Sequence, residues 1–293
     1  MAEIKFIKRA DLDVNEWDDC VQNAPKPMVY ALHWYLDALC DNNWAALVYG
    51  NYEAVMPLPI KYKWGVPVIY QPFFCQQLGV FSQTANPPSY IDLIKKIPFR
   101  FLKVGLHLNA SQPFPPGLKT RTNFLLNLNA DYEMLFSDFH PDARKNIRKA
   151  ATAGATVRET TDFKAAIELY KEVWGLANPH ILPRHYACFE KACAAARQHQ
   201  NLFCVEASLN DTLLGMAIFL KNHRYLHYVC AAPTAEGKKW GIMHSIIHFA
   251  IQQHAGTATI LDFEGSEIPG VAEFYKKFNP VEERYGVYSW VLL

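Results

Sequence analysis

The chain has 293 residues, of which 51% are hydrophobic and 14% aromatic, which predicts a globular protein with a well-packed core and room for two domains. Its 29 basic and 28 acidic side chains leave a net charge of +1, so there is no chain-wide argument for binding nucleic acid or a membrane. No apolar run approaches the length of a membrane span, and the charged start of the chain is unlike a signal peptide. We therefore expect a cytoplasmic protein without a membrane span.

The seven cysteines are scattered along the chain. Their number is odd, and none of them stands in a CxxC motif or in a paired Cys/His spacing. We expect them to be reduced and mostly buried.

The first half of the chain reads as a mixture of strands and helices. Alternating or β-branched runs predict strands over residues 3–9, 45–49, 54–62, 99–106 and 122–128, with an aromatic, proline-interrupted edge strand and loop over 64–82. Apolar residues at helical spacing predict helices over residues 11–24, 31–40 and 89–97.

The second half repeats this order more clearly. Strands are predicted over residues 156–159, 202–207, 213–220, 224–231, 257–263 and 285–292. Helices are predicted over residues 162–174 and 183–199, from an entrance near Gly237 to a stop at Gly256, and over a short segment that holds Phe274, Tyr275 and Phe278. The fold class is therefore α/β with mixed sheets, in two similar tandem domains over residues 1–137 and 138–293.

The stretch with the clearest chemical interest is the helix entrance at Gly237 to Gly241, which carries Lys238 and Lys239. Free backbone N–H groups at a helix start, with two ammonium groups beside them, suit a phosphate or pyrophosphate. We predict an anion site here. The alternative is that both lysines lie on a solvated helix face.

The densest basic cluster is Arg144, Lys145, Arg148 and Lys149, in a predicted helix that Pro141 begins. Arg144 and Arg148 are four residues apart and share a face, so they can hold a carboxylate or phosphate of a substrate by forked hydrogen bonds. Two alternatives stay open: a solvated amphipathic helix, and a module that binds tRNA or other RNA.

Two segments carry a resemblance to a known family. HPDARKNIRKAATAGATV, at 140–157, resembles the helix that opens the second domain in the FemAB-like branch of the GNAT acyltransferases, and LDFEGSEIPGVAEFYKKFN, at 261–279, resembles the strand, glycine-serine loop and closing helix of the same family. The first half matches by element order and by PMVYALHWYLDAL at 27–39. The resemblance implies tandem GNAT-like domains that transfer an acyl or aminoacyl group from a thioester or ester to an amine. Acyl-CoA or aminoacyl-tRNA is then the donor, and a small molecule or peptide supplies the amine.

The chain departs from the family at the acyl-CoA signature, Q/R-x-x-G-x-G/A. That signature falls on residues 238–243 and keeps only Gly241, while Met243 stands where backbone must approach a pyrophosphate closely. The long helical-hairpin arm that aminoacyl-transferring members commonly carry for tRNA is also missing from the sequence pattern.

The resemblance places the GNAT tyrosine on Tyr275, with Lys276 beside it as a substrate contact. In simpler acyltransferases this tyrosine protonates the leaving thiolate. Glu264, two residues past the strand's Asp262, is the candidate base for the amine, directly or through a water, and Ser266 follows where ligands gather in open α/β sheets. The alternative for Tyr275 is core packing.

Other candidates are weaker. His227 and Tyr228 lie on a predicted strand where a base could sit. His244 and His248 have chelating spacing, but no third ligand stands at metal-site spacing, so we predict no metal. The alternative for the whole chain is a non-catalytic binding or scaffold protein on the GNAT fold, because fold alone does not fix function.

Overall fold

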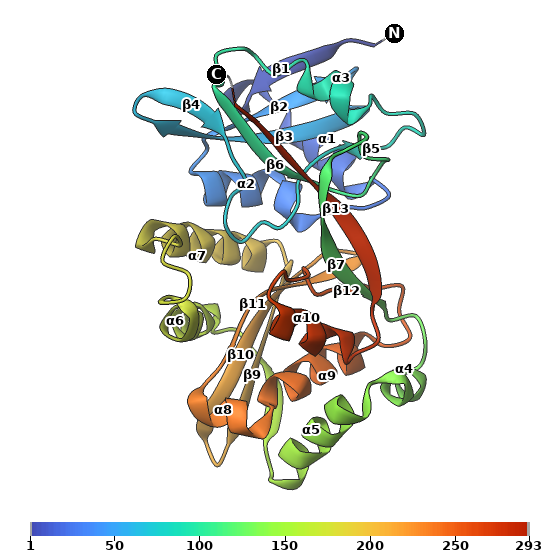
Figure 1. Cartoon of the computed structure of the whole chain (residues 1–293), viewed down its shortest axis with the longest axis vertical. Helices are drawn as coiled ribbons and strands as arrows, with labels where there is room; N and C mark the ends of the chain where they lie inside the picture. The colour runs from blue at the N-terminus through green and yellow to red at the C-terminus, as the bar shows by residue number, and fades with distance from the viewer. Residues whose placement is uncertain (1, 292–293) are drawn as a thin grey trace. The chain divides into compact units, whose positions relative to one another are not determined.

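The computed structural model describes residues 2–291 (Figure 1), which form two compact units. One unit comprises the residues up to Arg121 together with those from Arg284 onward, and the other is Thr122–Glu283. The predicted boundary after residue 137 lies inside the second unit, because the end of β7 (Lys119–Asn127) already pairs with that unit's sheet. The limits of the two GNAT-like domains themselves stay a prediction.

The first unit is built on a mostly antiparallel sheet. Its strands follow the order β1 (Ile4–Lys8), β2 (Trp44–Tyr49), β3 (Ala54–Lys63), β4 (Val66–Ile69), β6 (Lys103–Leu108) and β13 (Val281–Val291), with β5 (Phe81–Ser82) beside β3. Strands β4 and β6 pair in parallel. The helices are η1 (Arg9–Asp11), α1 (Val14–Gln22), η2 (Val29–Ala31), α2 (His33–Cys40) and α3 (Tyr90–Ile94). Leu292 of the predicted last strand lies outside the described residues.

Helix α1 shows how the sequence specifies where a helix begins and which of its faces is buried. The side chain of Asp13 caps its first amides, which are otherwise without partners. Trp17 is then fully buried, and its indole N–H donates to the carbonyl of Ala31 at 2.8 Å. The predicted helix is confirmed, with ends that are a few residues shorter.

The second unit also has one sheet. Its order is β7, β12 (Ile260–Asp262), β11 (Tyr225–Pro233), β10 (Thr212–Lys221), β9 (Leu202–Leu209) and β8 (Thr156–Thr160). The helices are α4 (Tyr132–Asp138), α5 (Pro141–Thr152), α6 (Phe163–Trp174), α7 (Pro183–Gln198), α8 (Ala235–Trp240), α9 (Ile242–His254) and α10 (Pro269–Lys276). Helices α6 and α7 lie on one side of this sheet, and α9 and α10 lie on the other (Figure 1).

The parallel step between β11 and β12 is the irregular point of this sheet. The two strands pair over three residues only, ending at His227 opposite Asp262. Beyond that point β11 continues along β10 as far as Pro233, whereas the chain after β12 turns away through Glu264 and Gly265, both in the left-handed region with φ of 61° and 58°. The two strands therefore separate.

Residues 2–291 include no helix long and apolar enough to cross a bilayer. All of the seven cysteines except the half-buried Cys188 are buried, as the sequence predicted.

The helix entrance differs in detail from the prediction. Helix α8 begins at Ala235, before Gly237, and the left-handed Gly241, with φ of 63°, separates it from α9. A Cβ at Gly237 would overlap the backbone carbonyl of Leu214. Gly237 is therefore required by the close packing of α8 on β10.

Replacing Gly237 with alanine should separate α8 from β10. Because the obstacle is backbone, overpacking should lower the free energy of unfolding by about 1–3 kcal/mol. Gly270→Ala is the matched control: it is also helical, it has open space around its Cβ, and alanine there should be neutral or slightly stabilising. Urea unfolding of both variants measures the difference, and equal stabilities would contradict the packing account.

Candidate active site

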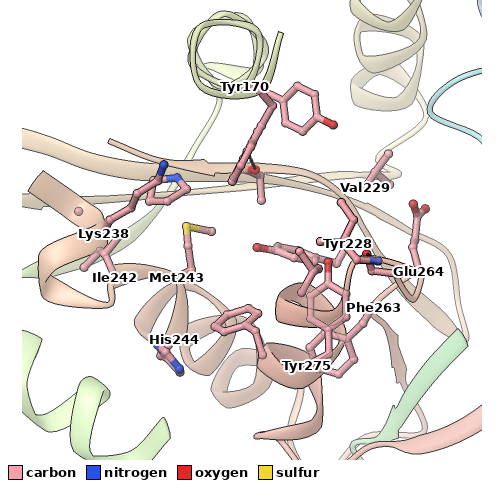
Figure 2. A pocket seen from close by; sticks show the side chains of 18 of the residues that line it. Tyr170, Tyr228, Val229, Lys238, Ile242, Met243, His244, Phe263, Glu264 and Tyr275 are labelled. Carbon is pink, nitrogen blue, oxygen red and sulfur yellow. Dashed lines mark hydrogen bonds between the residues drawn. The ribbon is translucent and has the colours of Figure 1, made fainter. Parts of the chain in front are cut away.

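A cavity of about 470 Å³ opens within the second unit where β11 and β12 separate. Its walls come from α6, the outer half of β11, the junction of α8 and α9, the loop after β12, and α10 (Figure 2). Of the nine residues predicted to be catalytic, cofactor-binding or substrate-binding, five line it: Lys238, Gly241, Glu264, Ser266 and Tyr275. Tyr228 and His244, which are among the other candidates named from the sequence, line it as well. They come from segments that the topology brings to one end of the sheet.

Glu264 is the acidic residue of this wall. Its Oε1 atom is buried and has no hydrogen-bond partner among the described residues. Burial raises the pKa of Glu264 from an ordinary 4.5 to about 8. A carboxyl group with a pKa near neutrality can both take up and release a proton, which is what a general base requires.

The backbone of Glu264 is held by its neighbours. Asp262 Oδ1 accepts the Glu264 amide at 2.8 Å, and Asp262 Oδ2 lies 3.1 Å from His227 Nδ1, with both of those side chains buried. A Cβ on Gly265 would overlap the Thr122 carbonyl of β7, so only glycine fits there. The turn that carries Glu264 is thus fixed on two sides.

Tyr275 presents its ring to the same cavity. It packs edge-on against Tyr228, with ring centroids 6.1 Å apart, and lies 5.1 Å from the ring of Phe263 (Figure 2). Its hydroxyl has no hydrogen-bond partner among residues 2–291. Burial, with the charge of Glu264 second, raises the pKa of Tyr275 above its ordinary value. The phenol therefore stays protonated near neutral pH.

The lining residues that were not anticipated from the sequence include Tyr170, Trp174 and Asn178. The Trp174 indole donates to the carbonyl of Ala231 on β11 at 3.1 Å, and the Lys238 ammonium lies 5.0 Å from the centre of the Trp174 ring. Two aromatic residues four apart at the end of an amphipathic helix were the available signal, but the same pattern is typical of a packed core.

Two of the backbone amides expected at the predicted anion site already have hydrogen-bond partners within α8 and its cap. The amide of Gly237 donates to Thr234 Oγ1, and that of Lys238 donates to the Thr234 carbonyl. The first turn of α9, by contrast, has no side-chain cap, and Ile242 and Met243 in that turn border the cavity. An anion at the cavity would therefore meet Lys238 and the start of α9.

Four predicted residues do not line the cavity. Lys239 pairs with Glu236 at 2.8 Å, and Lys276 lies 3.3 Å from Glu273. Arg144 donates to the Ser137 carbonyl at 2.9 Å. The Arg148 guanidinium lies 5.9 Å from the ring of Phe136. Both arginines therefore contact the α4 segment of their own unit, and their role in acceptor binding stays a prediction.

The two histidines with chelating spacing have other contacts. His244 Nδ1 lies 3.0 Å from the Gly241 carbonyl, and His248 Nε2 lies 2.7 Å from the Tyr132 hydroxyl. Burial lowers the pKa of both imidazoles. Within the described residues, no group of three or more His, Cys, Asp or Glu side chains is placed to hold a metal ion.

Residues 137–277, which include the whole cavity wall, match the sequence profile of the acetyltransferase (GNAT) domain family. The second half of the chain is a GNAT acyltransferase domain. The predicted resemblance is thus confirmed, and the reaction class of the chain is acyl transfer to an amine. None of the observations favours the non-catalytic alternative.

Solved structures show the same fold over the whole length. FemX has a TM-score of 0.70 at 14% identity, covering 98% of this chain and 97% of that one. A tandem GNAT protein from the clavulanic acid biosynthesis pathway has a TM-score of 0.56 at 14% identity, covering 99% of each chain. The C-terminal domain of a putative lysylphosphatidylglycerol synthetase from Agrobacterium fabrum has a TM-score of 0.51 at 12% identity, covering 97% and 93%. No curated protein matches the sequence. The tandem GNAT arrangement of the FemAB-like branch is confirmed at the level of the fold.

Replacing Glu264 with glutamine should stabilise the protein in a pH-dependent way. With the folded-state pKa raised from 4.5 to about 8, folding favours the protonated carboxyl, so its contribution is fully present below pH 4.5 and is lost as the pH rises through about 8. Glutamine has no charge to bury. The melting temperature of Glu264→Gln should therefore exceed that of the unmodified protein by a margin that grows across this range.

The exposed Glu267 in the same loop provides the control. Glu267→Gln should show no such growing margin in thermal unfolding followed at several pH values. A margin for Glu264→Gln that is independent of pH would show that this carboxyl ionises freely in the folded protein.

Proposed function

We propose that the cavity of the second unit is where the acyl transfer takes place, with Glu264 as the general base and Tyr275 as the general acid. The observation that carries this proposal is a buried Glu264 carboxylate oxygen with no hydrogen-bond partner among the described residues, in a cavity that the phenol of Tyr275 also lines. Buried polar groups are normally satisfied, so exceptions in a cavity indicate groups kept available for a substrate.

Glu264 acts on the acceptor. An ammonium group is not a nucleophile, so its proton has to leave before nitrogen attacks the acyl carbonyl. The Glu264 carboxylate takes this proton, directly or through one water, and the C–N bond of the amide forms. General base help of this kind contributes about 10²–10⁴-fold to a rate.

Tyr275 acts on the leaving group. As the C–S or C–O bond of the donor breaks, the departing atom gains the electron pair and takes the phenolic proton of Tyr275. Glu264, protonated in the first step, lines the same cavity as Tyr275 and is a source from which the phenol recovers its proton. The attacking nitrogen loses its second proton after the C–N bond has formed, and this proton leaves to solvent, so acyl transfer to an ammonium group releases one proton overall.

The donor that fits best is an acyl-CoA, with an aminoacyl-tRNA ester as the other candidate. Both carry phosphate, which Lys238, Gly241 and the first turn of α9 would hold. The mainly apolar wall that includes Tyr228, Phe263 and Met243 suits the uncharged part of the donor. A bound thioester would supply an activated carbonyl; the residues named here bind it, exclude water and move protons.

The acceptor is proposed to be a small molecule or peptide that carries an amine. Ser266 lines the cavity beside Glu264, and its hydroxyl accepts the Ile268 amide at 3.1 Å while its own O–H stays available to donate. Arg144, Arg148, Lys276 and Lys239 lie away from this wall, so any contact with substrate has to involve its distal parts.

Acyl-CoA binding should stabilise the protein against heat, and adjacent lysines should differ in their effect. A ligand at a hundred times its dissociation constant adds roughly 2.7 kcal/mol to the free energy of unfolding. Lys238→Ala should weaken this stabilisation and raise the Michaelis constant for the donor, because Lys238 lines the cavity. Lys239→Ala is the matched control and should leave both unchanged, because Lys239 pairs with Glu236.

Thermal unfolding with a panel of acyl-CoAs measures this prediction. Stabilisation by none of them would remove acyl-CoA as the donor and leave the aminoacyl ester. Equal losses in the two lysine variants would move the anion site to the exposed face of α8.

Tyr275→Phe should lower turnover by about 10²–10⁴-fold while leaving the fold intact, because phenylalanine keeps the ring contacts and removes only the proton donor. The assay is amide formation from the stabilising acyl-CoA and a panel of amines. Tyr132→Phe removes a hydroxyl that bonds His248 outside the cavity wall, and it should retain full turnover. Full turnover in Tyr275→Phe would instead assign Tyr275 to packing.

A further inference from the structure

Two segments of the first unit expose aromatic side chains that globular proteins usually keep covered. Trp64 is 91% exposed and Tyr62 66% exposed at the tip of the β3–β4 hairpin, and Phe99 is 84% exposed in the segment that enters β6. A single exposed apolar side chain needs no explanation, but a group of them on neighbouring segments marks an interaction surface.

The pairing of the strands brings these segments to one edge. Lys63 pairs with Val66 to close the hairpin, and Ile69 of β4 then pairs in parallel with Val104 of β6. Because both strands run the same way into that pair, the residues that precede them lie at the same edge of the unit. We call residues 61–65 and 95–103 together the basic aromatic edge.

The hairpin turn directs its tryptophan outward. Trp64 and Gly65 both have positive φ, 51° and 78°, as in the two-residue turns that favour asparagine or glycine. A tryptophan in this position strains the backbone, and no core contact compensates for it, since the side chain is almost fully exposed. Folding therefore does not account for Trp64.

The charge of this edge is one-sided although the chain as a whole is nearly neutral. Residues 61–69 and 95–108 contain no acidic residue. Their cations are Lys61, Lys63, Lys95, Lys96, Arg100 and Lys103. The Lys63 ammonium lies 4.6 Å from the centre of the Trp64 ring, so charge and aromatic surface are combined at the tip.

We propose that the basic aromatic edge docks the protein on the surface of a bilayer that contains anionic phospholipid. Lysines next to a membrane are attracted by the negative surface potential, and tryptophan and tyrosine prefer the boundary between headgroups and acyl chains. Leu102, 41% exposed on this edge, adds aliphatic surface that enters acyl chains.

Two other occupants fit less well. A second copy of the chain would bring six cations against six cations, and like charges in contact are unfavourable. A single-stranded nucleic acid would use the aromatic rings, but the exposed aliphatic side chain offers no base stacking, and only Arg100 carries the forked guanidinium suited to phosphate. The lipid surface uses all three kinds of side chain.

The test is flotation of the full chain with phosphatidylcholine vesicles, with and without phosphatidylglycerol. Binding should require phosphatidylglycerol and fall as salt is raised. Replacing one of Lys63, Lys96 or Lys103 with glutamine should lower the partition coefficient by up to about fivefold. Trp64→Ser and Phe99→Ser should each weaken binding further than one lysine does, and Trp64 emission should shift to shorter wavelength on binding.

Matched controls lie in the second unit. Leu176→Ser removes a side chain that is 97% exposed, and Lys145→Gln removes an exposed cation; neither should alter vesicle binding. Because the substituted side chains are exposed, far-UV circular dichroism should be unchanged in all variants. Failure to bind phosphatidylglycerol vesicles at low salt overturns the proposal. So does binding that is unchanged in Trp64→Ser, or capture by an RNA homopolymer in place of vesicles.

Discussion

The short parallel pairing between β11 and β12 is the constraint on which the second unit depends. The pair ends at His227 and Asp262, which are both buried and lie against each other. Beyond it, β11 stays paired with β10. The chain after Asp262 turns away, and this turn is held by the hydrogen bond from the Glu264 amide to the Asp262 side chain. A cavity forms because one strand continues and the other does not, and the carboxyl end of a parallel strand is where open α/β sheets place ligands.

The turn beyond Asp262 carries the buried Glu264 carboxyl group, which favours activity but lowers the stability of the folded state. A carboxyl group buried without a partner destabilises the folded state once it ionises, and a stable core would have replaced it. The chain instead fixes that group with a left-handed backbone, a hydrogen bond from the Glu264 amide to the Asp262 carboxylate, and a glycine that only fits because it has no Cβ. Local strain and an unsatisfied oxygen at one position are typical of a site shaped for chemistry.

Glycines near the predicted anion site have a different explanation from the one that motif reasoning suggests. Gly237 allows α8 to lie against β10, and a Cβ at Gly241 would approach Asn146 of α5 to 2.7 Å. Gly237 thus serves packing between elements of the same unit, and Gly241 leaves room for the Asn146 side chain in addition to the phosphate contact proposed for it. The weak form of the acyl-CoA signature is consistent with this, since the fold is shared with FemX at only 14% identity.

The sequence by itself determined the order of elements and the reaction class, and it predicted both residues that are proposed to be catalytic. Hydrophobic period and turn residues are local, and Glu264 and Tyr275 stand at recognisable places in a strand, loop and helix. Tertiary structure alone decided what depends on direction and neighbours. Lys238 and Lys239 are adjacent in the chain, but about 3.6 residues make a helical turn, so one faces the cavity and the other Glu236. Tertiary structure alone also brings Trp174 of α6 to the cavity wall. It likewise raises the pKa of Glu264, through burial. Burial is set by atoms from distant parts of the chain, and spacing along the sequence cannot report it.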